Sequence, residues 1–147
     1  MKDYDLLYEQ VLGYIIADAP RYSILSNITA VLDQMDDINW VGLYFVEGDD
    51  LFVGPFQGEV ACVKIEKGKG VCGTSFQRKR TVIVPDVNKF PGHIACSAAS
   101  KSEIVVPILK NKEVVAVIDV DAPVYNRFGE EEQKLLERVA KAIATIF

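Results

Sequence analysis

The spacing of apolar residues changes from helical to strand-like at Asn39, and this change constrains the fold more than any other feature. Before it, apolar residues recur every three or four positions, which predicts amphipathic helices over about 4–18 and 21–35. From 39 to 121, runs of β-branched and aromatic residues are separated by turn residues, which is typical of consecutive strands. A last helical pattern begins near Gly129. This order predicts an α+β fold, with an antiparallel sheet flanked by N- and C-terminal helices.

The region between the helices is expected to hold six strands and one short helix. Turn residues such as Gly48-Asp49-Asp50 and Lys110-Asn111-Lys112 divide the apolar runs and favour hairpins. The strands are expected at 39–46, 51–56, the end of 57–65, 81–84, 103–109 and 113–121, and the helix at 71–80.

The composition fits one domain over residues 1–147. Half of the 147 residues are hydrophobic and a quarter are charged, which is enough apolar surface for a substantial core. A formal net charge of −5 offers no basic surface for nucleic acid or anionic membrane. No apolar run approaches the roughly 18 residues of a membrane span. Three cysteines without a signal-peptide pattern indicate reduced thiols and a cytoplasmic protein.

The connection over 90–103 concentrates groups that carry chemistry. It holds the single histidine, His93, together with Cys96 and Glu103. Pro91-Gly92 marks a turn and the following residues are small and polar, so the segment is expected to be a loop. A cysteine on a loop can be exposed, and exposure together with thiolate character makes a thiol reactive. The alternative is an ordinary loop cysteine beside an unrelated histidine, and this segment alone does not decide between them.

Cys72 is the main rival to Cys96 as the reactive thiol. It lies near the start of the short helix expected at 71–80, where the helix dipole lowers the pKa of a thiol. A second alternative is a structural zinc site, because the three cysteines and His93 supply a Cys₃His ligand set. The spacing of these residues lacks the close cysteine pairs of zinc knuckles, and we expect no metal. The four residues of that set are Cys62, Cys72, His93 and Cys96.

Two further pairs suggest a binding site on the sheet. Trp40, Gly42 and Tyr44 share one face of a strand, and the glycine is expected to leave a hollow between the two rings. Asp119 and Asp121 also share a face, where two carboxylates repel unless a cation such as an ammonium group lies between them. The alternatives are a tryptophan that only fills core and a solvated strand end.

Several short segments resemble the free methionine-(R)-sulfoxide reductases, which are small GAF-domain enzymes. The resemblance runs from about Asn39 to the C-terminal helix, and the two N-terminal helices agree with it. GAF folds also serve as sensor modules, so the cysteine segments are more specific than the fold. The segments are 39–42 (NWVG), 54–58 (GPFQG), 71–73 (VCG), 91–96 (PGHIAC), 102–107 (SEIVVP) and 119–121 (DVD).

The resemblance implies a role for each candidate residue. Cys96 would be the nucleophile, Cys62 the resolving thiol and Cys72 a third cysteine that competes for the resolving role. Trp40 and Tyr44 would form an apolar pocket. The protein carboxylates that bind the substrate would be Glu103, Asp119 and Asp121. His93 is expected to hold its loop rather than to act as a base.

The reaction implied is the reduction of free methionine sulfoxide through a cysteine sulfenic acid and an intramolecular disulfide. The resemblance implies no cofactor, and it implies thioredoxin as the reductant and a homodimer as the assembly. Many members carry Asp after the nucleophile, whereas this chain has Ser97. The competing functions are a non-catalytic small-molecule-binding or redox-sensing GAF module and a peroxide-sensing thiol.

Overall fold

Six strands form one antiparallel sheet in the order β3-β2-β1-β6-β5-β4. The computed structural model describes residues 2–94, 96 and 98–147. All six strands predicted from the sequence are present, which confirms the α+β fold. They are β1 (Trp40–Glu47), β2 (Asp50–Gln57), β3 (Lys64–Glu66), β4 (Val82–Val84), β5 (Ser102–Lys110) and β6 (Glu113–Ala122).

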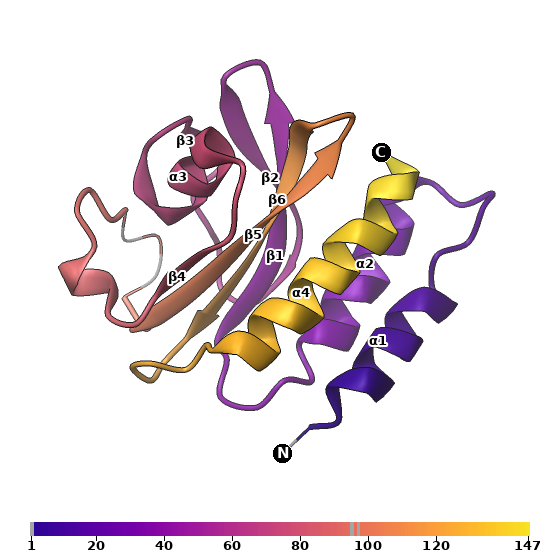
Figure 1. Ribbon diagram of the computed structural model, residues 1–147, viewed down its shortest axis with the longest axis horizontal. Coiled ribbons are helices and arrows are strands. Elements are labelled where there is room, and N and C mark those ends of the chain that lie inside the picture. The colour runs from indigo at the N-terminus through magenta and orange to yellow at the C-terminus, as the bar shows by residue number, and fades with distance from the viewer. Residues whose placement is uncertain (1, 95, 97) are drawn as a thin grey trace.

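Helices α2 (Arg21–Leu32) and α4 (Glu130–Ile143) cover one face of the sheet, α1 (Tyr4–Gly13) packs against these two helices, and α3 (Gly70–Arg78) covers the other face (Figure 1). Short 3₁₀ turns lie at Val87–Lys89 and Ala144–Ile146. Among the described residues, every helix lacks the length and apolar character needed to cross a lipid bilayer.

Both N-terminal helices are shorter than the sequence predicts, for the same physical reason. At the end of α1, the amides of Tyr14 and Ile15 donate to the carbonyls three residues back. At the end of α2, Gln34 and Met35 do the same. Such bonds tighten the last turn and satisfy carbonyls that have no helical partner. The apolar pattern therefore continues past the point where the α-helical bonding ends.

Each face of the sheet has its own core. The larger core lies between the sheet and α1, α2 and α4. The smaller core lies under α3 and includes Trp40, Tyr44 and Cys72. Because β1, β5 and β6 are covered on both faces, their sequences are almost continuously apolar rather than alternating. A carboxylate within such a strand is therefore removed from solvent.

The strand register brings three predicted site residues side by side. Across β1 and β6, Trp40 is paired with Asp121. Across β5 and β6, Glu103 is paired with the same Asp121. Directly paired residues point to the same face of a sheet, so all three side chains project toward α3. Asp119 lies two residues earlier on β6 and shares that face.

Gly42 is required by the ring that lies over it. A Cβ atom at this position would lie 2.4 Å from Phe56 Cβ and 2.6 Å from Trp40 Cη2. The expectation of a hollow beside Gly42 is therefore wrong, because the Trp40 indole itself fills that space.

Replacing this glycine tests the packing of the sheet face. We expect Gly42→Ala to lower the free energy of unfolding by about 2 kcal/mol, because the methyl group overpacks a filled core. Gly13→Ala is the matched control, since no atom lies within 4 Å of a Cβ there. Its helical position predicts a gain of up to about 1 kcal/mol. Urea denaturation of both variants measures the difference, and equal stability of the two would contradict the packing argument.

Candidate active site

One cavity under α3 collects the predicted site residues. All of them except Cys62 line it, and Cys62 is bonded to a residue that does. The floor is the sheet, and the walls come from α3, the loop before β3 and the connection before β5. The residues brought together are Trp40, Tyr44, Cys72, Cys96, Glu103, Asp119 and Asp121.

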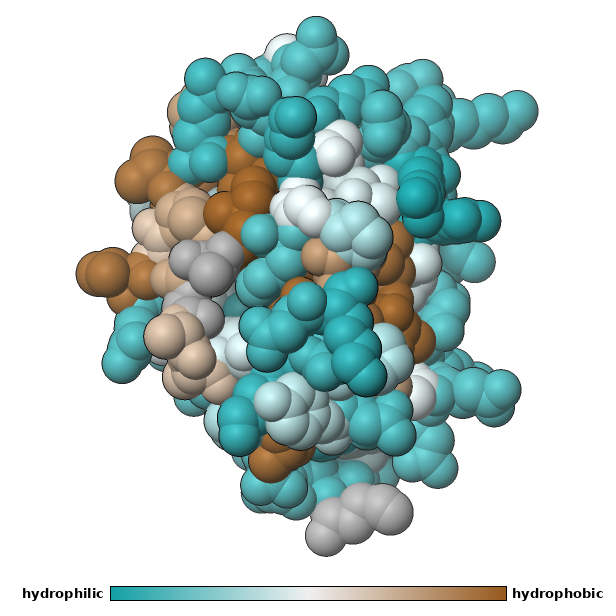
Figure 2. All heavy atoms as spheres, turned by 90° about the vertical axis from the view of Figure 1, so that its left-hand side faces the viewer, coloured by the Kyte–Doolittle hydropathy of each residue, from teal (hydrophilic) through white to brown (hydrophobic). Residues whose placement is uncertain are grey.

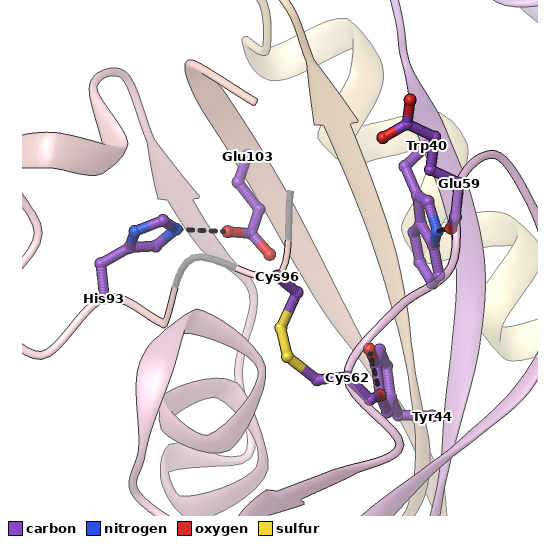
Figure 3. The surroundings of a disulfide bond; sticks show 7 residues. All are labelled: Trp40, Tyr44, Glu59, Cys62, His93, Cys96 and Glu103. Atoms are coloured by element: carbon purple, nitrogen blue, oxygen red, sulfur yellow. Dashed lines mark hydrogen bonds and ion pairs between the residues drawn. A yellow bond between two sulfur atoms is a disulfide. The ribbon is translucent and has the colours of Figure 1, made fainter. Parts of the chain in front are cut away.

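A disulfide joins Cys62 to Cys96 at the edge of this cavity (Figure 3). The two residues are 34 positions apart and their Cα atoms are separated by 5.4 Å. Cys62 lies on the loop between β2 and β3, and both cysteines are half-buried rather than fully exposed. The Tyr44 hydroxyl donates to the Cys62 carbonyl over 3.0 Å, which anchors that loop to the sheet. Two loop cysteines held this close can cycle between thiols and a disulfide.

Cys72 is a free, buried thiol, and the expectation that its pKa is lowered is wrong. Burial raises its pKa well above the usual value, and the negative charge of Asp119 raises it further. These effects outweigh the dipole of a helix of only nine residues. Cys72 therefore stays protonated, whereas a nucleophile must be a thiolate.

The three carboxyl groups are buried together, which excludes the solvated strand end. Glu103 is 7 % exposed and Asp119 is 6 % exposed. Burial raises the pKa of all three groups, and the charge of Asp119 raises those of Glu103 and Asp121 further. The Oδ1 atoms of both aspartates are inaccessible and have no hydrogen-bond partner in the described part of the chain. Such a site is suited to a ligand that carries hydrogen-bond donors and positive charge.

His93 lies beside one of these carboxyl groups. Its Nε2 atom is 3.9 Å from Glu103 Oε1, and its ring points toward that carboxyl (Figure 3). Burial lowers the pKa of His93, so the ring is neutral at neutral pH. That His93 holds its loop, rather than acting as a base, stays a prediction.

The aromatic side of the cavity is held by a hydrogen bond and by ring stacking. The Trp40 indole is 4 % exposed and donates from Nε1 to the Glu59 carbonyl over 3.0 Å. Its ring stacks on Phe56 at 5.2 Å and on Tyr44 at 6.0 Å. Phe56 was not singled out from the sequence as a site residue, although it lies in the GPFQG segment. Its contact with the indole follows from the pairing of Phe56 with Gly42 across β1 and β2.

The Cys₃His set does not come together as four free ligands, because the sulfur atoms of Cys62 and Cys96 are bonded to each other. Among the described residues, the group whose ligand atoms lie within 4.8 Å of one another is Cys72, Glu103 and Asp119. This group belongs to the cavity floor already described. The disulfide therefore argues against the alternative of a Cys₃His zinc site.

The rim of the cavity carries apolar side chains. Val60 and Ile94 line the cavity and are 87 % and 39 % exposed, and Val63 beside Cys62 is 67 % exposed. The side of the molecule that carries α3 shows apolar side chains gathered among hydrophilic ones (Figure 2). Ser97, where a departure from the family pattern was noted, lies outside the described residues, as does Ala95 of the PGHIAC segment.

Comparisons with known proteins agree with this geometry. The GAF domain family matches residues 21–147. The free methionine-R-sulfoxide reductase of Escherichia coli is 44 % identical over 126 residues, which cover 82 % of this chain and 76 % of that protein.

Two solved structures are also similar. The reduced form of fRMsr from Staphylococcus aureus has a TM-score of 0.94 and 48 % identity, and the match covers 99 % of this chain and 96 % of that one. The free methionine-R-sulfoxide reductase of Neisseria meningitidis, in complex with its substrate, has a TM-score of 0.95 and 35 % identity over 100 % and 92 % of the two chains. The chain therefore belongs to the GAF-domain family and, within it, to the free methionine-(R)-sulfoxide reductases.

Proposed function

We propose that this protein reduces free L-methionine-(R)-sulfoxide to methionine, with Cys96 as the nucleophile and Cys62 as the resolving thiol. The observation that carries the proposal is the Cys62–Cys96 disulfide at the edge of a cavity floored by three carboxyl groups. An amino acid presents an ammonium group, which suits those carboxyls, and an apolar end, which suits Trp40. The family relatives that carry this name support the same reaction.

The first step needs an acid beside a thiolate. A sulfoxide accepts a nucleophile only when its oxygen is protonated or strongly hydrogen-bonded. Glu103 is suited to this task, because burial and the charge of Asp119 keep its carboxyl protonated above the usual pKa. The Cys96 thiolate takes the oxygen and becomes a sulfenic acid, and the sulfur of the substrate leaves as the thioether of methionine.

The second step restores the protein. The Cys62 thiol attacks the sulfenic sulfur of Cys96, the S–O bond breaks, and the oxygen leaves as water. The product is the disulfide that the structure contains. A dithiol then reduces it through a mixed disulfide, and we propose thioredoxin as that dithiol. The homodimer stays a prediction.

The substrate ammonium explains why three acidic groups are buried together. In the absence of a cation, burial holds protons on Glu103 and Asp121. A positive charge placed among the three groups lowers their pKa values, and a carboxylate then forms an ion pair with it. Asp119 and Asp121 are proposed to bind the ammonium, while Glu103 supplies the proton to the sulfoxide oxygen.

The direct test compares substrates. The protein, with dithiothreitol or with thioredoxin and its reductase, is expected to convert the R epimer of free methionine sulfoxide. The S epimer and a peptide-bound sulfoxide should react at least about a hundredfold more slowly. Methionine release measured by chromatography reports the outcome. Cys96→Ser should abolish turnover with either reductant, and residual turnover in that variant would refute the nucleophile assignment.

The two remaining cysteines are separated by a single-turnover measurement. We expect Cys62→Ser to release one equivalent of methionine and then to stall with thioredoxin, because no disulfide can form. Cys72→Ser is the matched control and should continue to cycle, since its buried thiol has a raised pKa. If the stall appears in Cys72→Ser instead, the resolving thiol has been assigned to the wrong residue.

The carboxyl roles are separated by kinetics and pH. Glu103→Gln should lower kcat by about a hundredfold, the usual contribution of a general acid. It should also remove the alkaline limb of the pH profile, because that limb reports loss of the donated proton. Asp121→Asn should mainly raise KM, by about tenfold or more, since it weakens a charge-assisted contact.

Neither substitution should lower the free energy of unfolding at pH 7. A buried carboxyl with a raised pKa destabilises the fold as the pH rises above its unfolded value, and an amide removes that cost. Parallel urea denaturation checks this point. Identical kcat and KM effects in the two variants would contradict the division of roles.

A further inference from the structure

The side chain of Asn39 connects two segments that meet at Asp121. Its backbone amide donates to the Asp121 carbonyl over 2.9 Å. Its Nδ2 atom donates to Ser100 Oγ over 3.2 Å, across 61 positions of sequence. Asn39 therefore holds the end of β6 and the connection before β5 in one arrangement.

Ser100, which Asn39 contacts, lies at the cavity. It lines the cavity together with Asp121, and its hydroxyl lowers the pKa of the Asp121 carboxyl as a nearby hydrogen-bond donor. Because the Asn39 amide already donates to the Ser100 oxygen, the Ser100 proton is available for Asp121. Asn39 thus holds a donor from outside the acidic cluster beside Asp121.

The backbone beside Ser100 is fixed as well. The Lys101 amide donates to the Ala122 carbonyl over 2.7 Å, and the Lys101 carbonyl accepts from Val87 over 2.9 Å. Ser100 therefore has little freedom to move away from Asp121.

We propose that Asn39 and Ser100 are positioning residues for substrate recognition: their hydrogen-bonded chain orients the Asp121 carboxyl, so that one oxygen faces Ser100 and the other faces the substrate ammonium. The inference rests on the proposed function, which assigns the ammonium to Asp121. It is supported by the Asp121 Oδ1 atom, which is buried without a hydrogen-bond partner among the described residues and can accept from a donor that enters the cavity. Without the Ser100 hydroxyl, the carboxyl could rotate toward Glu103 or Asp119 and lose this arrangement.

The Asn39–Ser100 pair also affects the ionisation of Asp121. The Ser100 hydroxyl favours the charged carboxylate and opposes the rise in pKa caused by burial and by Asp119. The titratable groups that face Asp121 are Asp119 on its own strand, Glu103 on β5, Tyr44 on β1 and Cys72 on α3, while His93 faces Glu103 and Asp119. Among the described residues, the Ser100 hydroxyl approaches Asp121 from outside this set.

The test uses Ser100→Ala and Asn39→Ala, with Ser100→Thr as the conservative variant that keeps a hydroxyl. With free methionine-(R)-sulfoxide and dithiothreitol, we expect KM to rise about tenfold in Ser100→Ala and less in Asn39→Ala, while kcat changes less than twofold. The acid limb of kcat/KM should move to higher pH, because a carboxyl without this bond ionises later. Ser100→Thr should restore both properties, and Thr145→Ala should match the wild type as a control for loss of a remote hydroxyl bond.

A second measurement does not depend on activity. Titration of the Asp121 carboxyl carbon by nuclear magnetic resonance, in reduced protein without substrate, should show a higher pKa in Ser100→Ala and a normal one in Ser100→Thr. An unchanged titration, or an unchanged KM and pH profile, overturns the inference while leaving the proposed reaction intact. A wild-type protein that does not reduce the sulfoxide refutes the proposed function instead, and the titration still decides whether Ser100 acts on Asp121.

Discussion

The burial of three carboxyl groups on one face of the sheet is the constraint on which the rest of the site depends. Glu103, Asp119 and Asp121 lie on neighbouring central strands that are covered on both faces. A buried charge is costly, so such groups hold protons or wait for a cation. Either state is useful in a reaction that consumes a proton and binds an ammonium group. The fold therefore shields these groups from water, which would weaken their electrostatic interactions.

The two faces of the sheet divide stability and function between them. The face covered by α2 and α4 carries the larger apolar core. The face under α3 has the smaller core, and its buried carboxyl groups line the cavity.

The thiols lie on different kinds of element from the carboxyl groups. Cys62 and Cys96 lie on two connections rather than on strands, and each can move without breaking the sheet. Cys72 lies within α3, buried and with a raised pKa. Placement on loops suits the pair that must form and break a bond in every turnover, whereas placement on a helix suits a thiol that packs. A GAF module that only binds a small molecule needs the cavity but has no need of this pairing.

The sequence by itself determined the order of helices and strands and the face on which each paired set of residues lies, because apolar spacing follows local backbone geometry. It also placed Cys96, Glu103, Asp119 and Asp121 among the residues that carry chemistry. Only the tertiary structure decided that Glu103 and Trp40 both pair with Asp121, that the Trp40 ring fills the space beside Gly42, and that Asn39 reaches Ser100. It also decided that the pKa of Cys72 is raised rather than lowered. Spacing along the chain is a local property, whereas strand register, desolvation and charge interactions arise between segments that the chain brings together only when it folds.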